Sequence, residues 1–286
     1  MPAEALSPRL EHAPRFARAR LILHIAKGAV LLASVYRWSD AARRTAMIRN
    51  WSARLLALCG ITLKVHTHGE VLAGGAMVVS NHVSWLDIFV IDAWRPTPFV
   101  AKSEIARWPV IGWMSSSIGT VFIQRSRRSD AKRIVDMLSE ILRRQSLICL
   151  FPEGTTSDGT AVLDFHANIL QAAVSAGAPV QPLCLMYEDA QGRQSLAPAY
   201  VGDITLGETL RQVLACAPMI AHLHIGAPLY GLSRRREAAS RTHEAVSAGL
   251  RALQSLVGPA DAAALAEAQR RTAVRPPEFA ASPKRD

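Results

Sequence analysis

Short apolar runs alternate with longer amphipathic stretches between residues 60 and 257. The short runs end at glycine, proline or polar residues, which is typical of buried strands, whereas the longer stretches repeat apolar residues at helical spacing. The predicted strands are residues 61–66, 76–80, 98–101, 120–124, 147–151, 180–186 and 220–226. The predicted helices are residues 85–93, 109–117, 130–144, 168–176, 207–215 and 235–256. This alternation predicts an α/β domain with a mixed, largely parallel sheet flanked by helices.

Residues 15–59, ahead of this domain, hold two further helical patterns, and Gly60 ends the second. The first contains an apolar run at residues 21–36 that is interrupted by His24 and Lys27 and flanked on both sides by arginines. The run has 16 residues, whereas a helix that spans a bilayer needs about 20. An apolar segment between arginines is typical of a helix in the membrane interface, so we expect a membrane-associated helical pair. The alternatives are a single span and a surface helix packed on the protein's own core.

These patterns divide the chain into four regions. We expect a flexible N-terminus at residues 1–14, the membrane-associated helical region at 15–59, the α/β domain at 60–257 and a disordered tail at 258–286. The first twenty positions are polar and charged and do not resemble a signal peptide. We therefore expect the protein on the cytoplasmic face of an inner membrane, either peripheral or held by a single N-terminal span.

The charge balance favours an anionic partner. The formal net charge is +10, which suits nucleic acid, an acidic membrane surface or a phosphorylated substrate. The four cysteines occur singly, which argues against a disulfide framework and a zinc site and fits a reducing compartment. The pairs at 66 and 68 and at 222 and 224 are histidines at strand spacing, but no third ligand is evident, so no metal site is predicted.

The most informative polar segment lies between two apolar runs and reads Asn-His-Val-Ser-Trp-Leu-Asp at residues 81–87. A histidine at the end of a buried strand with an aspartate one turn into the next element is how a general base is mounted and oriented. His82 and Asp87 are therefore candidate catalytic residues. Ser84 and Asp87 also have the spacing of a capping box, which would give Asp87 a structural duty alone.

A second polar segment, Phe-Pro-Glu-Gly-Thr at residues 151–155, directly follows the predicted strand at 147–151. Loops at the carboxyl ends of strands build the active sites of open α/β sheets, so this loop and the His82 loop are expected to face one crevice. Arg125 follows another predicted strand and would be an ordinary surface charge if it stood alone. Pro182 lies inside an apolar run, which predicts an edge strand or a bulge there.

These motifs, in this order and spacing, resemble those of the glycerolipid acyltransferase family, in particular the 1-acyl-glycerol-3-phosphate acyltransferases and their lysolipid-acylating relatives. The resemblance covers residues 60–230 and rests on the His-x4-Asp and Phe-Pro-Glu-Gly pair. Residues 99–102 and 109–112 also look like the stretch between that family's first two motifs. The resemblance implies an enzyme that moves a fatty acyl chain from acyl-carrier protein or coenzyme A to the free hydroxyl of a lysolipid. The leading acceptor is 1-acyl-glycerol-3-phosphate, which would give phosphatidic acid.

The resemblance also implies roles for individual residues. His82 would take the proton of the acceptor hydroxyl, and Asp87 would hold the imidazole in the right tautomer. The residues implied in binding the acceptor are Arg125, Glu153, Gly154, Thr155 and Lys102. Arginine suits phosphate oxygens, and lysine would add positive charge to the pocket.

One departure from the family pattern bears on the acceptor. Many members that acylate a phosphate-bearing acceptor carry an arginine after Phe-Pro-Glu-Gly-Thr, whereas this chain has Thr156, and Asp158 follows nearby. A missing charged hydrogen bond is worth about 1.5–3 kcal/mol, which is enough to shift the acceptor preference. A lyso-ornithine lipid is therefore the alternative acceptor.

Two other classes of function compete with acyl transfer. A thioesterase or lipase would use water in place of the lysolipid hydroxyl, but no nucleophile elbow lies on a strand-to-helix turn. A non-catalytic membrane or nucleic-acid adaptor would not need the His82 and Asp87 pair, and no nucleic-acid motif accompanies the basic residues at 125–133. The chain has no P-loop and no Gly-x-Gly-x-x-Gly motif, so no nucleotide cofactor is predicted.

Overall fold

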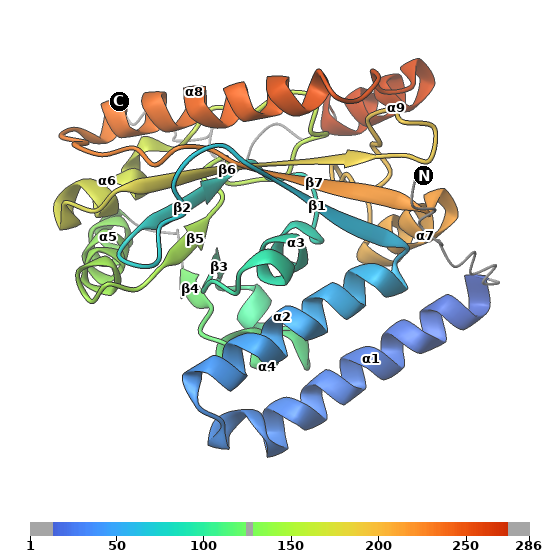
Figure 1. Ribbon diagram of the computed structural model, residues 1–286, viewed down its shortest axis with the longest axis horizontal. Coiled ribbons are helices and arrows are strands. Elements are labelled where there is room, and N and C mark those ends of the chain that lie inside the picture. The colour runs from blue at the N-terminus through green and yellow to red at the C-terminus, as the bar shows by residue number, and fades with distance from the viewer. Residues whose placement is uncertain (1–13, 124–127, 274–286) are drawn as a thin grey trace, which may run out of the picture.

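The computed structural model describes residues 14–123 and 128–273, which Figure 1 shows. Its centre is a five-stranded sheet in the order β1-β7-β6-β2-β5. The strands are β1 (Ile61–Thr67), β2 (Met77–Ser80), β5 (Ile148–Leu150), β6 (Val180–Glu188) and β7 (Met219–Ile225). Neighbouring strands run parallel, except that β6 and β7 are antiparallel. The mixed, largely parallel sheet predicted from the sequence is confirmed.

The two remaining predicted strands are present but lie outside this sheet. They are β3 (Val100–Lys102) and β4 (Val121–Ile123), which pair in parallel as a small second sheet. Phe99, just before β3, forms a parallel bridge with Cys149 of β5. Because this bridge aligns β3 with β5, the carboxyl ends of both sheets point to the same edge.

The predicted helices of the domain are all found. They are α3 (Asp87–Trp94), α4 (Ile111–Ser117), α5 (Arg128–Arg143), α6 (Ala167–Ala176), α7 (Leu206–Cys216) and α8 (Arg235–Gln254), with two short 3-10 helices, η1 (Tyr36–Trp38) and η2 (Ile105–Arg107). Figure 1 shows α8 along one face of the sheet and α3 on the other. The central strand β6 explains this layering because its side chains alternate. Leu183 and Leu185 pack in the core with α3, whereas Cys184 and Met186 pack against α8.

The edge strand or bulge predicted at Pro182 is wrong, because β6 lies between β7 and β2 and is buried. Proline cannot donate to a ladder, but it stands just past the last residue of β7. There its carbonyl accepts from the Gly226 N–H at 2.9 Å, and the Gln181 Nε2 donates to the Gly226 carbonyl at 2.5 Å. A neighbouring side-chain amide thus replaces the donor that proline lacks, which allows a proline in a central strand.

The two helical patterns before Gly60 form the pair α1 (Pro14–Ser34) and α2 (Ala41–Leu58), which Figure 1 shows side by side beyond α3. His24 and Trp51 join the pair, with ring centroids 4.9 Å apart and nearly parallel planes. The Trp51 Nε1 donates to the His24 carbonyl at 3.2 Å. Gly28 lies so close that a Cβ there would meet the Trp51 ring nitrogen at 2.4 Å. The contact between the two helices therefore includes the stacked His24 and Trp51 rings, their hydrogen bond and the close approach at Gly28.

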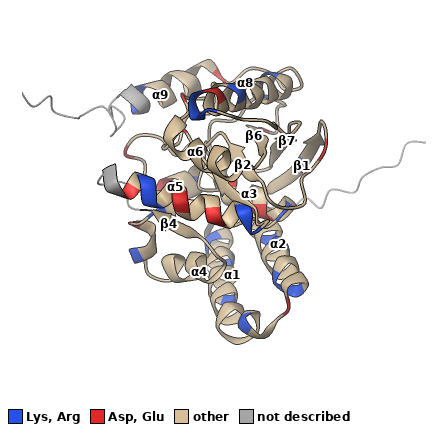
Figure 2. Ribbon diagram, turned by 90° about the vertical axis from the view of Figure 1, so that its left-hand side faces the viewer, with Lys and Arg blue, Asp and Glu red and all other residues tan. Residues whose placement is uncertain are grey.

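The first helix is longer than the 16-residue run suggested. The segment Phe16–Trp38, 23 residues long, is apolar and long enough to cross a membrane by length and composition, and 11% of its most apolar window is buried. Lysine and arginine lie along α1 and α2 (Figure 2), and residues 14–60 contain a single acidic residue, Asp40. An apolar, exposed, basic helix pair is compatible with both an interfacial helix and a single span.

The tail predicted from residue 258 onward is in part wrong. Residues Ala262–Ala273 form the helix α9, and Ala268 is buried. Arg193 reaches Asp261, just before this helix, at 3.5 Å. Alanine has the highest helix propensity, so an alanine-rich stretch can form a docked helix without a large apolar run. Residues 1–13, 124–127 and 274–286 lie outside the described part of the chain.

Candidate active site

The loop after β2 is anchored by Asn81. Its side-chain oxygen accepts from the Leu185 N–H at 2.7 Å, and its Nδ2 donates to the Leu185 carbonyl at 3.0 Å. The side chain is fully buried, so the amide continues the pairing of β2 with β6 where the backbone leaves the sheet. The next residue, His82, therefore starts from a fixed position at the carboxyl edge of the sheet.

Asp87, the first residue of α3, has its carboxylate fully buried and accepts four hydrogen bonds. The Oδ2 accepts from His82 Nδ1 at 2.8 Å. It also accepts from the backbone N–H groups of Val83 at 2.7 Å and Ser84 at 2.9 Å. The Oδ1 accepts from the Tyr187 hydroxyl at 2.7 Å. Because backbone N–H groups can only donate, Oδ2 is the acceptor in the bonds from Val83 and Ser84.

The structural interpretation of Asp87 is compatible with the catalytic one, which stays a prediction. The Ser84 N–H bond to Asp87 is one half of a capping box, and the Ser84 Oγ accepts from the Leu86 N–H at 3.3 Å. The same carboxylate that secures the start of α3 thus also holds the histidine ring.

The His82 side chain is 21% exposed, whereas the carboxylate behind it is 0% exposed. Its ring stacks on Phe151, with centroids 4.0 Å apart and an interplanar angle of 11°. The Phe99 ring also lies nearly parallel to Phe151, with the two ring centroids 6.1 Å apart. With Nδ1 donating to Asp87, the tautomer leaves Nε2 unprotonated, and Nε2 has no partner among the described residues. This is the geometry of a general base that faces outward from an oriented imidazole.

Glu153 lies behind the same histidine, with its carboxyl group turned inward. The Oε1 accepts from the His82 backbone N–H at 2.9 Å, and the Oε2 accepts from the Leu163 N–H at 3.3 Å. The residue is 4% exposed. Burial, with a smaller contribution from the charge of Asp87, raises the pKa of Glu153 to about 8, although the two hydrogen bonds lower it. In this arrangement Glu153 positions the His82 backbone, and its predicted contact with the acceptor stays a prediction.

The Phe-Pro-Glu-Gly loop and the His82 loop are tied at a second point. The Ser157 N–H donates to the His82 carbonyl at 2.8 Å, so both backbone groups of His82 bond to this loop. Thr156 donates its hydroxyl to the Tyr200 carbonyl. In the same turn the Asp158 Oδ1 accepts from the Thr160 N–H at 2.9 Å. The two loops that sequence analysis placed at one crevice are therefore in direct contact.

The other predicted binding residues differ in their surroundings. Thr155 is exposed, and Gly154 has φ +72°, which glycine adopts readily. Lys102 is exposed at the end of β3, three residues beyond the bridge at Phe99, and so lies at the same edge as the Glu153 loop. Arg125 lies outside the described residues.

Sequence analysis missed two residues that position the His82 loop and the Asp87 carboxylate, namely Asn81 and Tyr187. Tyr187 is fully buried, and both burial and the charge of Asp87 raise its pKa well above 10, which keeps it protonated as a donor. The predicted strand ended one residue before it. Its position in the alternation with Leu183 and Leu185 is the signal that places it on the face toward α3.

Comparison with known proteins identifies the family of this chain. A family model described as Acyltransferase matches residues 62–186. A lyso-ornithine lipid O-acyltransferase of Pseudomonas aeruginosa is 34% identical over 209 residues, which are 72% of this chain and 79% of that protein. The chain therefore belongs to the acyltransferase family.

Other relatives of this chain are named as acyltransferases of a different acceptor. A 1-acyl-sn-glycerol-3-phosphate acyltransferase of Neisseria meningitidis serogroup B is 40% identical over 161 residues, 56% of this chain. The match spans 63% of that relative's length, which is less than two thirds. The crystal structure of the 1-acyl-sn-glycerophosphate (LPA) acyltransferase PlsC from Thermotoga maritima superimposes with a TM-score of 0.60 at 22% identity, over 84% of this chain and 98% of that chain. The structural match shows that the two proteins share a fold.

The raised pKa of Glu153 predicts a pH dependence of stability. The unfolded chain releases this proton near pH 4.5, whereas the folded protein keeps it up to about pH 8. Because the folded pKa is the higher one, the stabilisation is present at low pH and is lost as the pH rises from 4.5 to 8, by about 1.4 kcal/mol per pH unit. Urea unfolding across this range should show the loss in the wild type and a flatter curve in Glu153→Gln.

The exposed Glu104 supplies the matched control, since Glu104→Gln should follow the wild-type curve. If the curve of Glu153→Gln runs parallel to that of the wild type, the proton is not held at Glu153.

The Tyr187 hydroxyl predicts a separate effect on catalysis. Tyr187→Phe leaves Asp87 Oδ1 without its donor, and an unsatisfied buried group costs about 1–3 kcal/mol. We expect kcat to fall about tenfold or more with little change in KM. The exposed Tyr230→Phe is the control, and an unchanged kcat in Tyr187→Phe would contradict this role.

Proposed function

We propose that this protein transfers a fatty acyl chain from the thioester of acyl-carrier protein or coenzyme A to the free hydroxyl of a lysolipid. The observation that carries the proposal is the His82 ring, which is held by a buried carboxylate on one nitrogen and open on the other. The names of the relatives support the reaction class.

The reaction follows from the tautomer of His82. The Nε2 accepts the proton of the acceptor hydroxyl while its oxygen attacks the thioester carbonyl. The tetrahedral intermediate collapses with cleavage of the carbon–sulfur bond, and the imidazolium returns its proton to the leaving thiolate. The products are the oxygen ester and the free thiol. Asp87 stays ionised and stabilises the imidazolium, so no protein nucleophile is needed.

We propose that the acceptor binds at the edge where both sheets end. We propose that Lys102, Gly154 and Thr155 contact its polar head, together with Arg125, because lysine and arginine suit a phosphate or carboxylate. Glu153 acts behind them by holding the His82 backbone, which sets the direction of Nε2.

We propose two candidate acceptors, of which 1-acyl-glycerol-3-phosphate is the leading one. The 40% identity to the Neisseria protein of that name supports it. Lyso-ornithine lipid is the second candidate, supported by the longer match to the Pseudomonas protein. Thr156 also favours the second acceptor, because its hydroxyl is bonded to the Tyr200 carbonyl and it supplies no cation.

We further propose that the α1–α2 pair holds the protein on an anionic membrane, on the cytoplasmic face of an inner membrane. Large apolar side chains of α1 and η1 are exposed, namely Phe16, Ile22, Leu23, Val30 and Trp38. Such side chains with nearby arginines suit the boundary of acyl chains and headgroups. A membrane position would deliver a lysolipid to the enzyme without its leaving the bilayer.

The test is an acyl-transfer assay with the wild type and His82→Ala in mixed micelles. Labelled acyl-carrier protein and coenzyme A thioesters are offered with each of the two acceptors, and the lipid products are separated. We expect diacyl product from the wild type and a loss of about 10²–10⁴-fold in the variant, because a positioned general base supplies about that much.

The product identifies the acceptor directly, since the two lysolipids give different diacyl lipids. Free fatty acid alone would assign a thioesterase, and turnover that survives His82→Ala would contradict the proposed base.

A further inference from the structure

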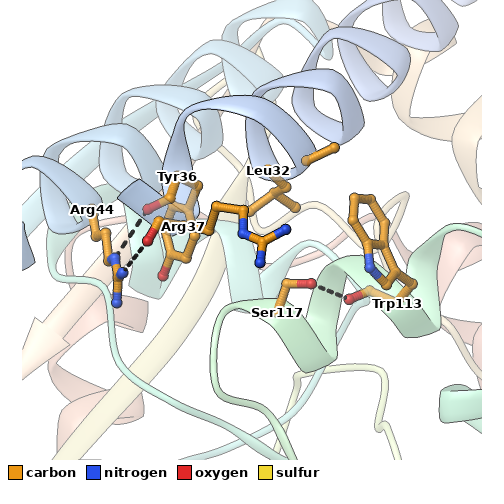
Figure 3. A pocket seen from close by; sticks show the side chains of 7 residues that line it. Leu32, Tyr36, Arg37, Arg44, Trp113 and Ser117 are labelled. Carbon is orange, nitrogen blue, oxygen red and sulfur yellow. Dashed lines mark hydrogen bonds between the residues drawn. The ribbon is translucent and has the colours of Figure 1, made fainter. Parts of the chain in front are cut away.

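A groove lies between the end of α1, η1 and α4, with a volume of about 340 Å³. Its lining residues are Leu32, Ala33, Tyr36, Arg37, Arg44, Trp113 and Ser117. Figure 3 shows the Arg37 guanidinium projecting into this space, with Trp113 on the side of α4. The groove shares no lining residue with the His82 site.

The two arginines of the groove differ in their partners. Arg44 is structural, because its guanidinium donates to the Tyr36 carbonyl at 3.0 Å and to the Arg37 carbonyl at 2.8 Å. The Arg37 guanidinium forms no hydrogen bond or ion pair with a described residue, and lies 5.2 Å from the centre of the Trp38 ring. None of the residues that line the groove is acidic. Arg37 thus offers its donors to a ligand.

The rest of the groove suits an apolar chain next to that charge. Leu32 and Ala33 come from α1, and the Trp113 ring is 46% exposed. More apolar side chains are exposed around α4, with Trp108 at 44%, Val110 at 48% and Ile111 at 36%. Tryptophan is enriched where one part of a side chain meets acyl chains and another meets water. The groove therefore combines a free guanidinium with an apolar rim.

We propose that this groove binds the phosphate of an anionic membrane phospholipid, with its acyl chain lying along Leu32, Ala33 and Trp113. A guanidinium pairs with phosphate oxygens through two parallel N–H donors. The apolar rim favours a lipid over a free anion, because a bound inorganic phosphate would leave the rim exposed to water. The site is apart from the His82 site and does not depend on acyl transfer.

This assignment extends the membrane contact from the helix pair to the catalytic domain. The segment η2–α4 follows β3, whose neighbour Phe99 belongs to the aromatic stack beside His82. A lipid held between η1 and α4 would join the N-terminal pair to the domain that carries the chemistry. The active-site edge would then keep a fixed orientation to the bilayer.

The test is calorimetric titration of the full-length protein with dihexanoyl phosphatidylglycerol below its micelle concentration, where no charged surface exists. We expect Arg37→Gln to weaken binding about tenfold or more, because a charged hydrogen-bonded pair is lost. Arg43→Gln removes the same charge from an exposed position outside the groove, and it should bind like the wild type.

Three further titrations separate this site from others. Inorganic phosphate and glycerol phosphate should bind much more weakly than the lipid, and an equal affinity would assign a free-anion site. His82→Ala should bind the lipid normally, since the groove is separate from the catalytic site. Loss of acyl transfer in that variant would leave the groove assignment intact.

A second variant tests the groove independently in case Arg37→Gln does not fold. Ser117→Glu places a carboxylate in the groove at an exposed helix position and should abolish lipid binding while the thermal unfolding midpoint stays near that of the wild type. The proposal is overturned if Arg37→Gln binds like the wild type, or if Arg43→Gln loses as much affinity as Arg37→Gln does.

Discussion

The site depends on one buried carboxylate. Asp87 has no exposure to solvent, and an ionised group in such a place is costly unless donors surround it. Here the donors are two backbone N–H groups, the Tyr187 hydroxyl and the His82 ring. Each hydrogen bond to a charged group is worth about 1.5–3 kcal/mol. Together they hold the charge in place and, with it, the imidazole and the first turn of α3.

The fold supplies these donors from two elements, the loop after β2 and the strand β6. The Val83 and Ser84 N–H groups come from the loop after β2, which Asn81 fixes to β6. Tyr187 comes from the end of β6, on the face that packs against α3. Glu153 and Ser157 then bond the two backbone groups of His82 from the neighbouring loop. The histidine is therefore held at its backbone, at Nδ1 and on its ring face, whereas Nε2 has no partner in the described part of the chain.

Much of the fold could be read from the sequence because it follows local patterns. Each apolar run that was predicted to be a strand is one, and His82 with Asp87 form a pair because a short loop keeps them close. Features that depend on distant partners could not be read in the same way. Pro182 predicted an edge, since the replacement of its missing donor by Gln181 exists only once the β7 terminus lies beside it.

The inward turn of Glu153 has the same origin. A carboxylate in a loop after a strand predicts an exposed ligand contact, and only the folded loop shows its oxygens on the N–H groups of His82 and Leu163. The contact of Tyr187 with Asp87 was not predicted because the predicted strand ended before Tyr187. The alternation of side chains along β6 nevertheless places Tyr187 toward α3. The helix α9 was missed because alanine forms helices without an apolar face that a sequence pattern would reveal.

The central claim is that Asp87 fixes the His82 tautomer with its proton on Nδ1. Nitrogen-15 NMR of the imidazoles measures this directly, and the spectrum of His82→Ala assigns the resonance among the nine histidines. We predict that His82 at neutral pH has a protonated Nδ1 and an unprotonated Nε2. We also predict that Asp87→Asn removes this preference. A His82 ring with its proton on Nε2, or a mixture of tautomers unchanged by Asp87→Asn, would contradict it.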